Sequence, residues 1–266
     1  MAELRERGVA FVGTARVELK DHVVVDLRDV IAVRSLLANV RPDLIINLAA
    51  VGVHYEHRSA EEIVNVNVCL PVLLAEEMPE GCRLVHAGSM SEYVGDEGCM
   101  TEDAPRGSNT PYGRSKIAAD DFLALVPRPI VRARVFGVIG AGERANRLIP
   151  TIVASRRNGM PILLSDGAQM RDVLHVSDVA RALLSLAGGV VSGPVNIGSG
   201  EGHTVREIAE RAAQRLGIER LLRFDAVSRH FGEVDRIVAN VDRLRSAGFR
   251  PHLSFEQAVD RAVDEG

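Results

Sequence analysis

The chain has 266 residues and a formal net charge of −4, with 46% apolar and 26% charged residues. This composition is typical of a soluble globular protein that is long enough to bury a substantial core. The mild acidity predicts neither a nucleic acid nor an anionic membrane as a partner. In addition, no apolar run reaches the ~18 residues that a membrane-spanning helix needs.

The cysteines and histidines predict no metal centre. Cys69, Cys82 and Cys99 are an odd, sparse set that lacks the spacing of a zinc site or a disulfide framework, which favours a reducing, cytoplasmic compartment. His54 and His57 are the only close histidine pair, and we interpret them as residues of a surface loop. The first eight residues lack the apolar core of a signal peptide.

Short apolar runs alternate with longer helical patterns in the first half of the chain. Unbroken apolar strands separated by helices are typical of a parallel sheet that is covered on both faces. The predicted fold class is therefore α/β, a doubly wound, Rossmann-like parallel sheet. Strands are predicted at Val9–Gly13, Val23–Val25, Asp43–Ala50, Arg83–Ala87 and Ile130–Phe136, and helices at Asp29–Val40, Ala60–Met78 and Tyr112–Val126.

The second half mixes short strands with helices whose ends carry capping signals. Thr204 and Ser254 are each followed three residues later by Glu or Gln, which is the spacing of a capping box. Gly159 is expected to end a helix. Helices are predicted at Leu148–Asn158, Val176–Ala187, Thr204–Leu216 and from Ser254 onward, and strands at Pro161–Leu164 and Pro194–Gly198.

Tyr112 and Lys116 are the sharpest local signal for chemistry. Residues four apart on a helix lie on one face, so the ammonium is expected to lower the pKa of the phenol and let it pass a proton near neutral pH. Lys20 is the only other lysine in the chain. The alternative is an exposed helical pair that adds only a few tenths of a kcal/mol to stability.

A hydroxyl-rich turn follows the predicted strand Arg83–Ala87. Ligands of doubly wound folds bind beyond the carboxyl ends of strands, where Ser89 can donate a hydrogen bond to a substrate oxygen. Ser91 is the alternative hydroxyl. Glu92 and Tyr93 are either sugar contacts or simple loop residues, and His86 is expected to be a hydrogen-bonded core residue.

Further segments complete a family pattern that runs along nearly the whole chain. They are Asp26–Asp29, Asn47–Ala50, Val66–Val68, Arg171–Asp178 and Val195–Gly200. Together with Ser89, Tyr112 and Lys116, these segments resemble the extended short-chain dehydrogenase/reductase family. Within it, the resemblance is to the NAD-dependent epimerase/dehydratase group that acts on nucleotide sugars.

The resemblance implies hydride transfer at a sugar carbon. Tyr112 is then the general acid/base, Ser89 polarises the carbonyl or hydroxyl, and Lys116 holds the cofactor ribose and lowers the pKa of Tyr112. Asn67 is implied to orient the region of the catalytic lysine. Cofactor contacts are implied for Asp26, Leu27, Leu48, Ala49, Ala50, Tyr112 and Lys116.

Arg16 bears on the choice of cofactor. It lies within a few residues of the first predicted strand, where such folds recognise the adenosine ribose. An acidic residue there would bond the 2′-hydroxyl, whereas an arginine accommodates a 2′-phosphate. We therefore predict NADP over NAD.

The resemblance also implies two interleaved lobes and a nucleotide-sugar substrate. Residues 1–137 and 172–198 would form the dinucleotide-binding lobe, and residues 138–171 and 199–266 the sugar-binding lobe. A homodimer that packs through Ala60–Met78 and Tyr112–Val126 is implied. Substrate contacts are predicted for Ser91, Glu92, Asn146, Arg147, Arg171 and Arg229, the arginines because they bind phosphate in a bidentate manner.

The turn after Ser89 separates the branches of the family. Dehydratases of the group carry an acidic pair directly after the catalytic hydroxyl, whereas Met90 and Ser91 stand there in this chain. Residues 88–93 look most like the turn of reductases that act on nucleotide-linked 4-keto-6-deoxyhexoses. Gly137 and Ala141 depart from the pattern of those reductases. A ketoreductase is the first hypothesis and a sugar epimerase the second, because both use the same triad.

One family feature does not occur in this sequence, namely the N-terminal strand, glycine-rich turn and helix that bind the pyrophosphate. Residues 1–8 look like the last turns of that helix. We expect either that the natural chain is longer or that the protein is a non-catalytic binder of nucleotide sugars. Without that strand, its neighbours should expose their edges and a wide apolar groove.

Overall fold

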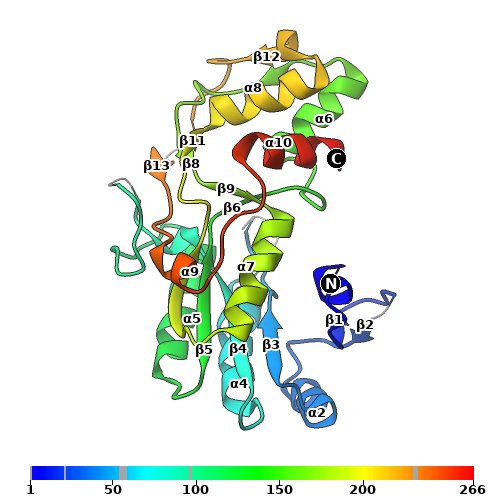
Figure 1. Ribbon diagram of the computed structural model, residues 1–266, viewed down its shortest axis with the longest axis vertical. Helices are drawn as coiled ribbons and strands as arrows, with labels where there is room; N and C mark the ends of the chain where they lie inside the picture. Colours follow the sequence, from blue (N-terminus) through cyan, green and yellow to red (C-terminus); the bar gives the residue numbers. More distant parts are fainter. Residues whose placement is uncertain (1, 21, 54–58, 96–97, 230–232) are drawn as a thin grey trace. The chain divides into compact units, whose positions relative to one another are not determined.

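The computed structural model describes residues 2–20, 22–53, 59–95, 98–229 and 233–266, so the His54/His57 pair lies outside the described residues. Two compact units make up the chain, and both are discontinuous in sequence (Figure 1). Unit 1 comprises Met1–Tyr93, Arg106–Arg134 and Leu183–Val195, and unit 2 comprises Val94–Pro105, Val135–Ala182 and Asn196–Gly266. Assignment of the units to cofactor and sugar stays a prediction.

The main sheet of unit 1 is built from strands far apart in sequence. Their order is β10-β5-β4-β3, with β3 at Leu44–Asn47, β4 at Arg83–Ser89, β5 at Ile130–Val135 and β10 at Gly193–Ile197. β3 and β4 are parallel, with Asn47 opposite His86. Parallel strands end at the same edge of a sheet, so the residues that follow β3 and β4 are brought near one another.

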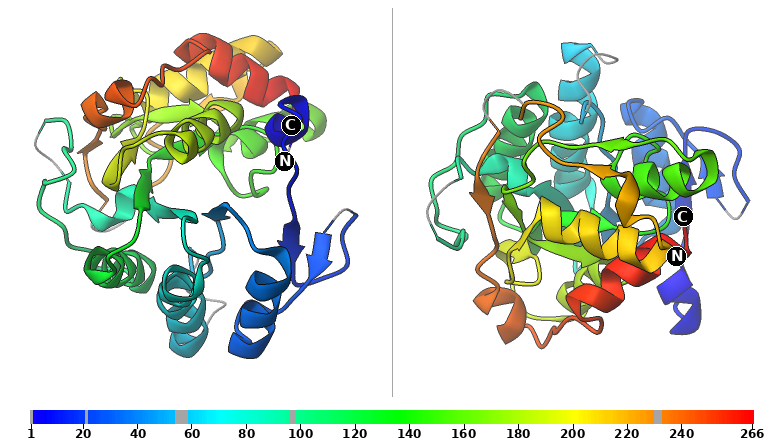
Figure 2. Two further views of the ribbon diagram at one scale, coloured as in Figure 1. Left: turned by 60° about the horizontal axis from the view of Figure 1, so that its bottom comes forward. Right: turned by 90° about the horizontal axis from the view of Figure 1, so that it is seen from above.

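A layer of helices covers one face of this sheet (Figure 2, left). It contains α2 (Val30–Val40), α4 (Leu70–Glu77) and α5 (Pro111–Leu125), whose apolar side chains pack with those of β4 into one buried cluster. The helix predicted at Ala60–Met78 is confirmed, with α3 (Ala60–Val64) and a π-helical turn η2 (Asn65–Cys69) before α4. π turns inside helices are frequently found at functional sites.

The N-terminal strands stand apart from the main sheet. After α1 (Ala2–Glu6), β1 (Gly13–Ala15) and β2 (His22–Val24) form a separate parallel pair, so the strand predicted at Val9–Gly13 starts only at its last residue. Among the described residues β3 ends the main sheet, and apolar side chains near these edges are exposed, with Val12 at 49% and Leu48 at 61%. These open edges agree with the sequence expectation.

Unit 2 has short strands and a core between three helices. α6 (Leu148–Asn158), α8 (Val205–Leu216) and α10 (Phe255–Asp264) bury one apolar cluster, and Figure 2 (right) shows α8 beside α10. Both capping boxes and the left-handed Gly159 are confirmed. The remaining elements are β6 (Gly137–Ile139) parallel to β9 (Val173–His175), β7 (Ile162–Leu163) parallel to β12 (Leu222–Arg223), the sheet β11 (His203–Thr204)-β8 (Met170–Arg171)-β13 (Arg236–Ile237), α7 (Val176–Gly188) and α9 (Asp242–Ser246).

The described residues lack two further kinds of feature. None of their helices has both the length and the apolarity that crossing a membrane requires. No three His, Cys, Asp or Glu side chains in the same residues gather in a way that could hold a metal ion.

Candidate active site

Ser89 is held at the point where β4 becomes a turn. It is the N-cap of a short 3₁₀ helix, η3 (Met90–Glu92), and its Oγ accepts a hydrogen bond from the backbone N of Ser91 at 3.1 Å. The Ser89 side chain is also hydrogen-bonded to Tyr112. Because Oγ already accepts one bond from Ser91, the hydroxyl proton is available to the phenol.

Tyr112 and Lys116 lie on one face of α5, as predicted. Thr110 caps the helix and Pro111 occupies its first turn, which places Tyr112 at its N-terminal end. The Lys116 side chain is buried, donates from Nζ to the carbonyl of Ala87 at 2.7 Å, and lies 5.8 Å from the centre of the Tyr112 ring. The structure therefore brings Ser89, Tyr112 and Lys116 together within unit 1.

Gly113 allows this close approach. A Cβ at this position would lie 2.5 Å from the carbonyl oxygen of Ser91 and 2.1 Å from Oγ of Ser108. Any side chain there would push the start of α5 away from the Ser89 turn. The glycine between the two catalytic candidates thus sets how near Tyr112 can come to Ser89.

Burial governs the pKa values of the pair. Burial raises the pKa of Tyr112, and the hydrogen bond with Ser89 acts in the opposite direction. The predicted lowering of the Tyr112 pKa is thus not the net direction. Burial lowers the pKa of Lys116 to about 8, against the nearby charge of Glu92, so its ammonium titrates within reach of physiological pH.

Asn67 acts through neighbouring groups and not by direct contact with Lys116. It lies fully buried in the π turn, where its Nδ2 donates to the carbonyl of Val51 and to Oγ of Ser115, both at 2.9 Å. Its Oδ1 accepts from the backbone N of Val51, and Ser115 donates to the carbonyl of Tyr112. Asn67 thereby joins the loop after β3 to the first turn of α5.

The predicted cofactor residues follow the ends of parallel strands. Arg16 comes directly after β1 and pairs with Glu62 at 3.5 Å, while its side chain stays half exposed. Asp26 follows β2, and hydrogen bonds from Arg28 lower its pKa to about 2. Leu27 is half-buried against the unit 1 core. Leu48, Ala49 and Ala50 follow β3, and the backbone N of Ala49 donates to Asn47.

The predicted substrate arginines lie in unit 2. Arg171 donates to Glu233 at 2.8 Å, and Arg229 makes a bidentate pair with Asp166 at 2.7 and 2.6 Å. Burial lowers the pKa of Arg171, and the charge of Arg229 acts in the same direction, which shows that the two cations are close. Asn146 and Arg147 are exposed just before α6.

Glu92 is placed differently from the other predicted sugar contacts. It is fully buried, and its carboxylate oxygens accept from the backbone N of Ser89 and from Nε of Arg134, each at 2.9 Å. Ser91 keeps a partly exposed position in the same turn. Arg134 and Asp120 were missed in the sequence. Asp120 continues the spacing of Tyr112 and Lys116 by one more turn, and Arg134 is a charged residue inside an apolar strand, so both carried a signal.

Residues 1–198 match the NAD dependent epimerase/dehydratase family. The chain belongs to this family. The dTDP-glucose 4,6-dehydratase of Neisseria gonorrhoeae is 31% identical, with 90% of this chain and 78% of the relative aligned. The corresponding dehydratase of Xanthomonas campestris is 27% identical over 92% of this chain and 78% of the relative.

Solved structures of the family share this fold. MoeE5 in complex with UDP-glucose and NAD is 28% identical, with a TM-score of 0.86 over 99% of this chain and 92% of that one. The UDP-glucose 4-epimerase of Thermus thermophilus in complex with NAD is 23% identical, with a TM-score of 0.87 over 99% and 93%. The α/β Rossmann-like fold and the family resemblance are thus confirmed, and relatives act as both dehydratases and epimerases.

Proposed function

We propose that this enzyme of the family is an oxidoreductase that reduces the keto group of a nucleotide-linked 4-keto-6-deoxyhexose with NADPH. The observation that carries the proposal is the Ser89 hydroxyl bonded to the Tyr112 phenol beside the buried ammonium of Lys116. A positioned phenol with a nearby cation is suited to general acid/base catalysis. The 28%-identical neighbour that holds UDP-glucose and NAD supports a nucleotide sugar as the substrate.

The residues of the chain fit a nicotinamide dinucleotide at two ends. Tyr112 and Lys116 would face the ribose and nicotinamide side, while Arg16 and Asp26 follow β1 and β2, where the adenosine binds in such folds. The nicotinamide supplies the hydride when it is bound. No glycine-rich strand–turn–helix for the pyrophosphate occurs among the described residues.

Proton transfer is the task of Ser89, Tyr112 and Lys116. As the ketone carbon gains a hydride, its oxygen becomes basic and takes the phenolic proton of Tyr112. The Ser89 hydroxyl donates a hydrogen bond to the same oxygen, where charge develops in the transition state. Lys116 stabilises the phenolate that remains, since an ammonium near the ring favours the charged form of the phenol.

The turn after Ser89 argues against dehydration, although the curated relatives include dehydratases. Met90 and Ser91 stand where the sequence pattern of dehydratases has its acidic pair. The acid in this turn, Glu92, is buried and has both oxygens engaged by protein donors. It is therefore not presented to a sugar carbon.

A sugar epimerase is the second candidate. The observation in its favour is the likeness to MoeE5 in complex with UDP-glucose and NAD, because its sugar is not a keto sugar. Ser89, Tyr112 and Lys116 would serve both reactions. The same residues would serve a non-catalytic binder of nucleotide sugars only for binding, and that protein would show no turnover.

Turnover with defined nucleotide sugars tests the proposal. The purified chain is incubated with NADPH and a nucleotide-linked 4-keto-6-deoxyhexose while the absorbance of reduced nicotinamide is followed. We expect its decay, with one alcohol formed for each NADPH consumed. No decay, together with epimerisation of a plain UDP-hexose, would support the second candidate instead. Formation of a 4-keto-6-deoxy product from a nucleotide-linked hexose would identify a dehydratase.

Arg171 and Arg229 are the proposed contacts for the sugar diphosphate. Both are arginines of unit 2, close enough for their charges to interact, and both are now paired with carboxylates. A diphosphate offers planar arrays of oxygens that two guanidinium groups can bind in a bidentate manner. Asn146 and Arg147 are proposed as further substrate contacts from the start of α6.

Arg16→Ala is expected to weaken NADPH binding more than NADH binding. The loss of a charged hydrogen bond to the 2′-phosphate should raise the Kd for NADPH about tenfold or more, while the Kd for NADH changes little. Titration of cofactor fluorescence with both nucleotides measures the two values. Equal Kd values of the parent for NADPH and NADH would contradict the proposed NADP preference.

The helical face of unit 1 is the proposed homodimer surface. Phe122 and Leu125 on α5 are 54% and 80% exposed, and an apolar hollow lined by Leu27, Val72 and Phe122 opens between α2, α4 and α5. Exposed large apolar groups on adjacent helices favour burial against a partner. A second copy of the same face is the partner that the family resemblance implies.

Phe122→Glu is expected to convert a dimer into monomers. A carboxylate at the centre of an apolar interface would have to be desolvated without a counter-ion. Size-exclusion chromatography with light scattering measures the mass. Met160→Glu, which places the same charge at a 61% exposed apolar residue of unit 2, is the matched control and should leave the mass unchanged.

A further inference from the structure

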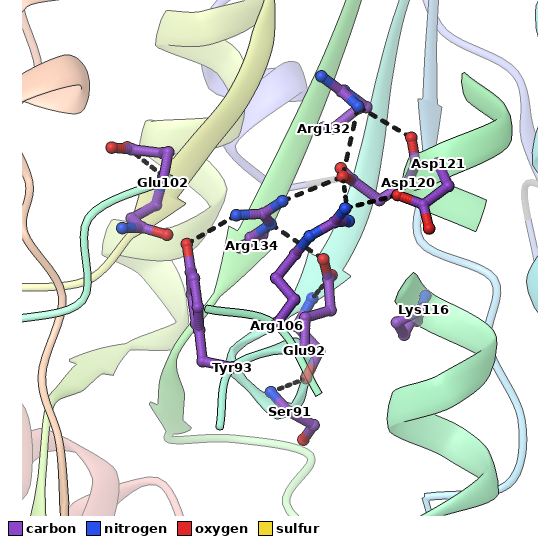
Figure 3. Close-up of polar contacts among 12 residues, drawn as sticks. Ser91, Glu92, Tyr93, Glu102, Arg106, Lys116, Asp120, Asp121, Arg132 and Arg134 are labelled. Atoms are coloured by element: carbon purple, nitrogen blue, oxygen red, sulfur yellow. Dashed lines mark hydrogen bonds and ion pairs between the residues drawn. The ribbon is translucent and has the colours of Figure 1, made fainter. Parts of the chain in front are cut away.

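Arg134 is the centre of a buried polar network in unit 1 (Figure 3). Its side chain is 2% exposed, and its guanidinium donates in three directions. Nε bonds Glu92 at 2.9 Å, one terminal nitrogen bonds the hydroxyl of Tyr93 at 2.9 Å, and the other bonds Asp120 at 3.0 Å. Removing one partner of such a buried ion pair leaves an uncompensated charge, so the three groups depend on one another.

Glu92 connects Arg134 to the Ser89 turn. Its Oε1 accepts the backbone N–H of Ser89 at 2.9 Å and completes the capping box of η3. Gly88 leaves room for this contact, because a Cβ at Gly88 would lie 2.6 Å from Oε1 of Glu92. The carboxylate can therefore reach Ser89 only while residue 88 has no side chain.

Asp120 connects Arg134 to the helix of Tyr112 and Lys116. It lies on α5 one turn beyond Lys116, and its Oδ2 accepts from Arg134, from Arg106 at 2.8 Å and from Arg132 at 3.3 Å. One guanidinium thus holds the turn that carries the catalytic hydroxyl and the helix that carries the catalytic phenol. The rigid planar fork of arginine suits this task better than the single ammonium of lysine.

We propose that Glu92, Arg134 and Asp120 are positioning residues that fix Ser89 against Tyr112, and that Glu92 must be ionised for them to do so. The importance of that distance rests on the proposed hydride-transfer function. Misplacement of reacting groups by about 1 Å can cost on the order of 10²-fold in rate. The network is therefore the part of this fold that sets the geometry of proton transfer.

Protonation of Glu92 would remove the acceptor that Nε of Arg134 uses. The charged and titratable groups that face Glu92 are Arg134 from β5 and Lys116, Tyr112 and Asp120 from α5. Burial raises the pKa of Glu92 to about 7, Asp120 acts in the same direction, and Arg134 opposes it. Because this pKa is raised, the folded protein takes up the proton as the pH falls below about 7, and the contact with Arg134 weakens there.

Glu92→Gln tests the positioning role with an uncharged side chain of the same shape. We expect kcat to fall about tenfold or more with KM for the sugar nearly unchanged, since substrate contacts stay in place. We also expect the acid limb of the kcat profile near pH 7 to disappear. Glu77→Gln is the matched control, because Glu77 accepts from Nε of Arg34 at 2.9 Å on the surface of unit 1. A fall in kcat with the acid limb intact would overturn the proposal.

A second measurement does not depend on turnover. The backbone amide resonance of Ser89, followed by NMR in the parent chain, should shift with a midpoint near pH 7 and lose this shift in Glu92→Gln. An amide resonance that does not change between pH 5 and 8 overturns the inference even if the protein reduces keto sugars. A titrating resonance supports it even if the substrate proposed above is wrong.

Gly88→Ala is the second variant in case Glu92→Gln does not fold. It leaves every charge of the network in place and displaces only the Glu92 carboxylate from the Ser89 amide. We expect the same loss of kcat and the same loss of the Ser89 titration. Activity and titration like those of the parent would overturn the proposal.

Discussion

Tyr112→Phe is expected to lower kcat for reduction of the keto sugar by about 10³-fold, within the 10²–10⁴ range that a positioned general acid contributes. The phenol is buried beside Ser89 and Lys116, so no solvent molecule of equal acidity takes its place at the same distance. Phenylalanine keeps the ring and removes only the oxygen, so the packing at the start of α5 is preserved.

Steady-state kinetics of the variant, with cofactor titration as a control, measure this effect. The Kd for NADPH should stay within a few-fold of the parent, because Lys116 is still present to hold the ribose. Turnover by Tyr112→Phe within tenfold of the parent would refute Tyr112 as the proton donor and with it the proposed mechanism.

Lys116→Met is expected to abolish most activity and to stabilise the fold. Burial holds the pKa of this lysine at about 8 in the folded protein against its ordinary value of 10.5. At pH 7 the folded protein must therefore keep a buried ammonium that the unfolded chain solvates, a cost of about 3 kcal/mol at 1.36 kcal/mol for each pKa unit. The lost bond to the Ala87 carbonyl offsets about 1 kcal/mol of the gain.

The sign of the pH dependence follows from the same shift. Between about pH 8 and 10.5 the unfolded chain binds the proton and the folded chain does not, so the stability of the parent rises with pH in this window. Lys116→Met should lack this rise and should start from a higher free energy of unfolding at pH 7. Denaturant unfolding at pH 7 and at pH 9.5 measures both effects. A variant less stable than the parent at pH 7 would refute the cost assigned to the buried ammonium.

Lys116→Met should also lower kcat by on the order of 10²-fold, since Tyr112 loses the cation that stabilises its phenolate. Stability and activity would then change in opposite directions. This combination separates a catalytic lysine from a structural one, because loss of a merely structural lysine would lower both. Far-UV circular dichroism of the variant confirms that the comparison is made on folded protein.

Local patterns were enough to predict several elements and most of the triad. The bounds of α6 and the capping boxes at Thr204 and Ser254 follow from residues within one turn of each other, and the structure has them as predicted. The placement of Tyr112 and Lys116 on one helical face likewise needs only a spacing of four. The strands of two or three residues in unit 2 were missed or shortened, because such short segments carry no periodicity and depend on their partners.

The sequence by itself determined the fold class, the family and the residues that a proton-transfer site would use, since these depend on periodicity and on short-range spacing. Only the tertiary structure decided what surrounds those residues. Glu92 bonds Arg134, 42 residues further along the chain, and the π turn carries Asn67 to a backbone partner 16 residues away. Burial sets the pKa values of Tyr112, Lys116 and Glu92, and burial is a property of packed neighbours that no local pattern contains.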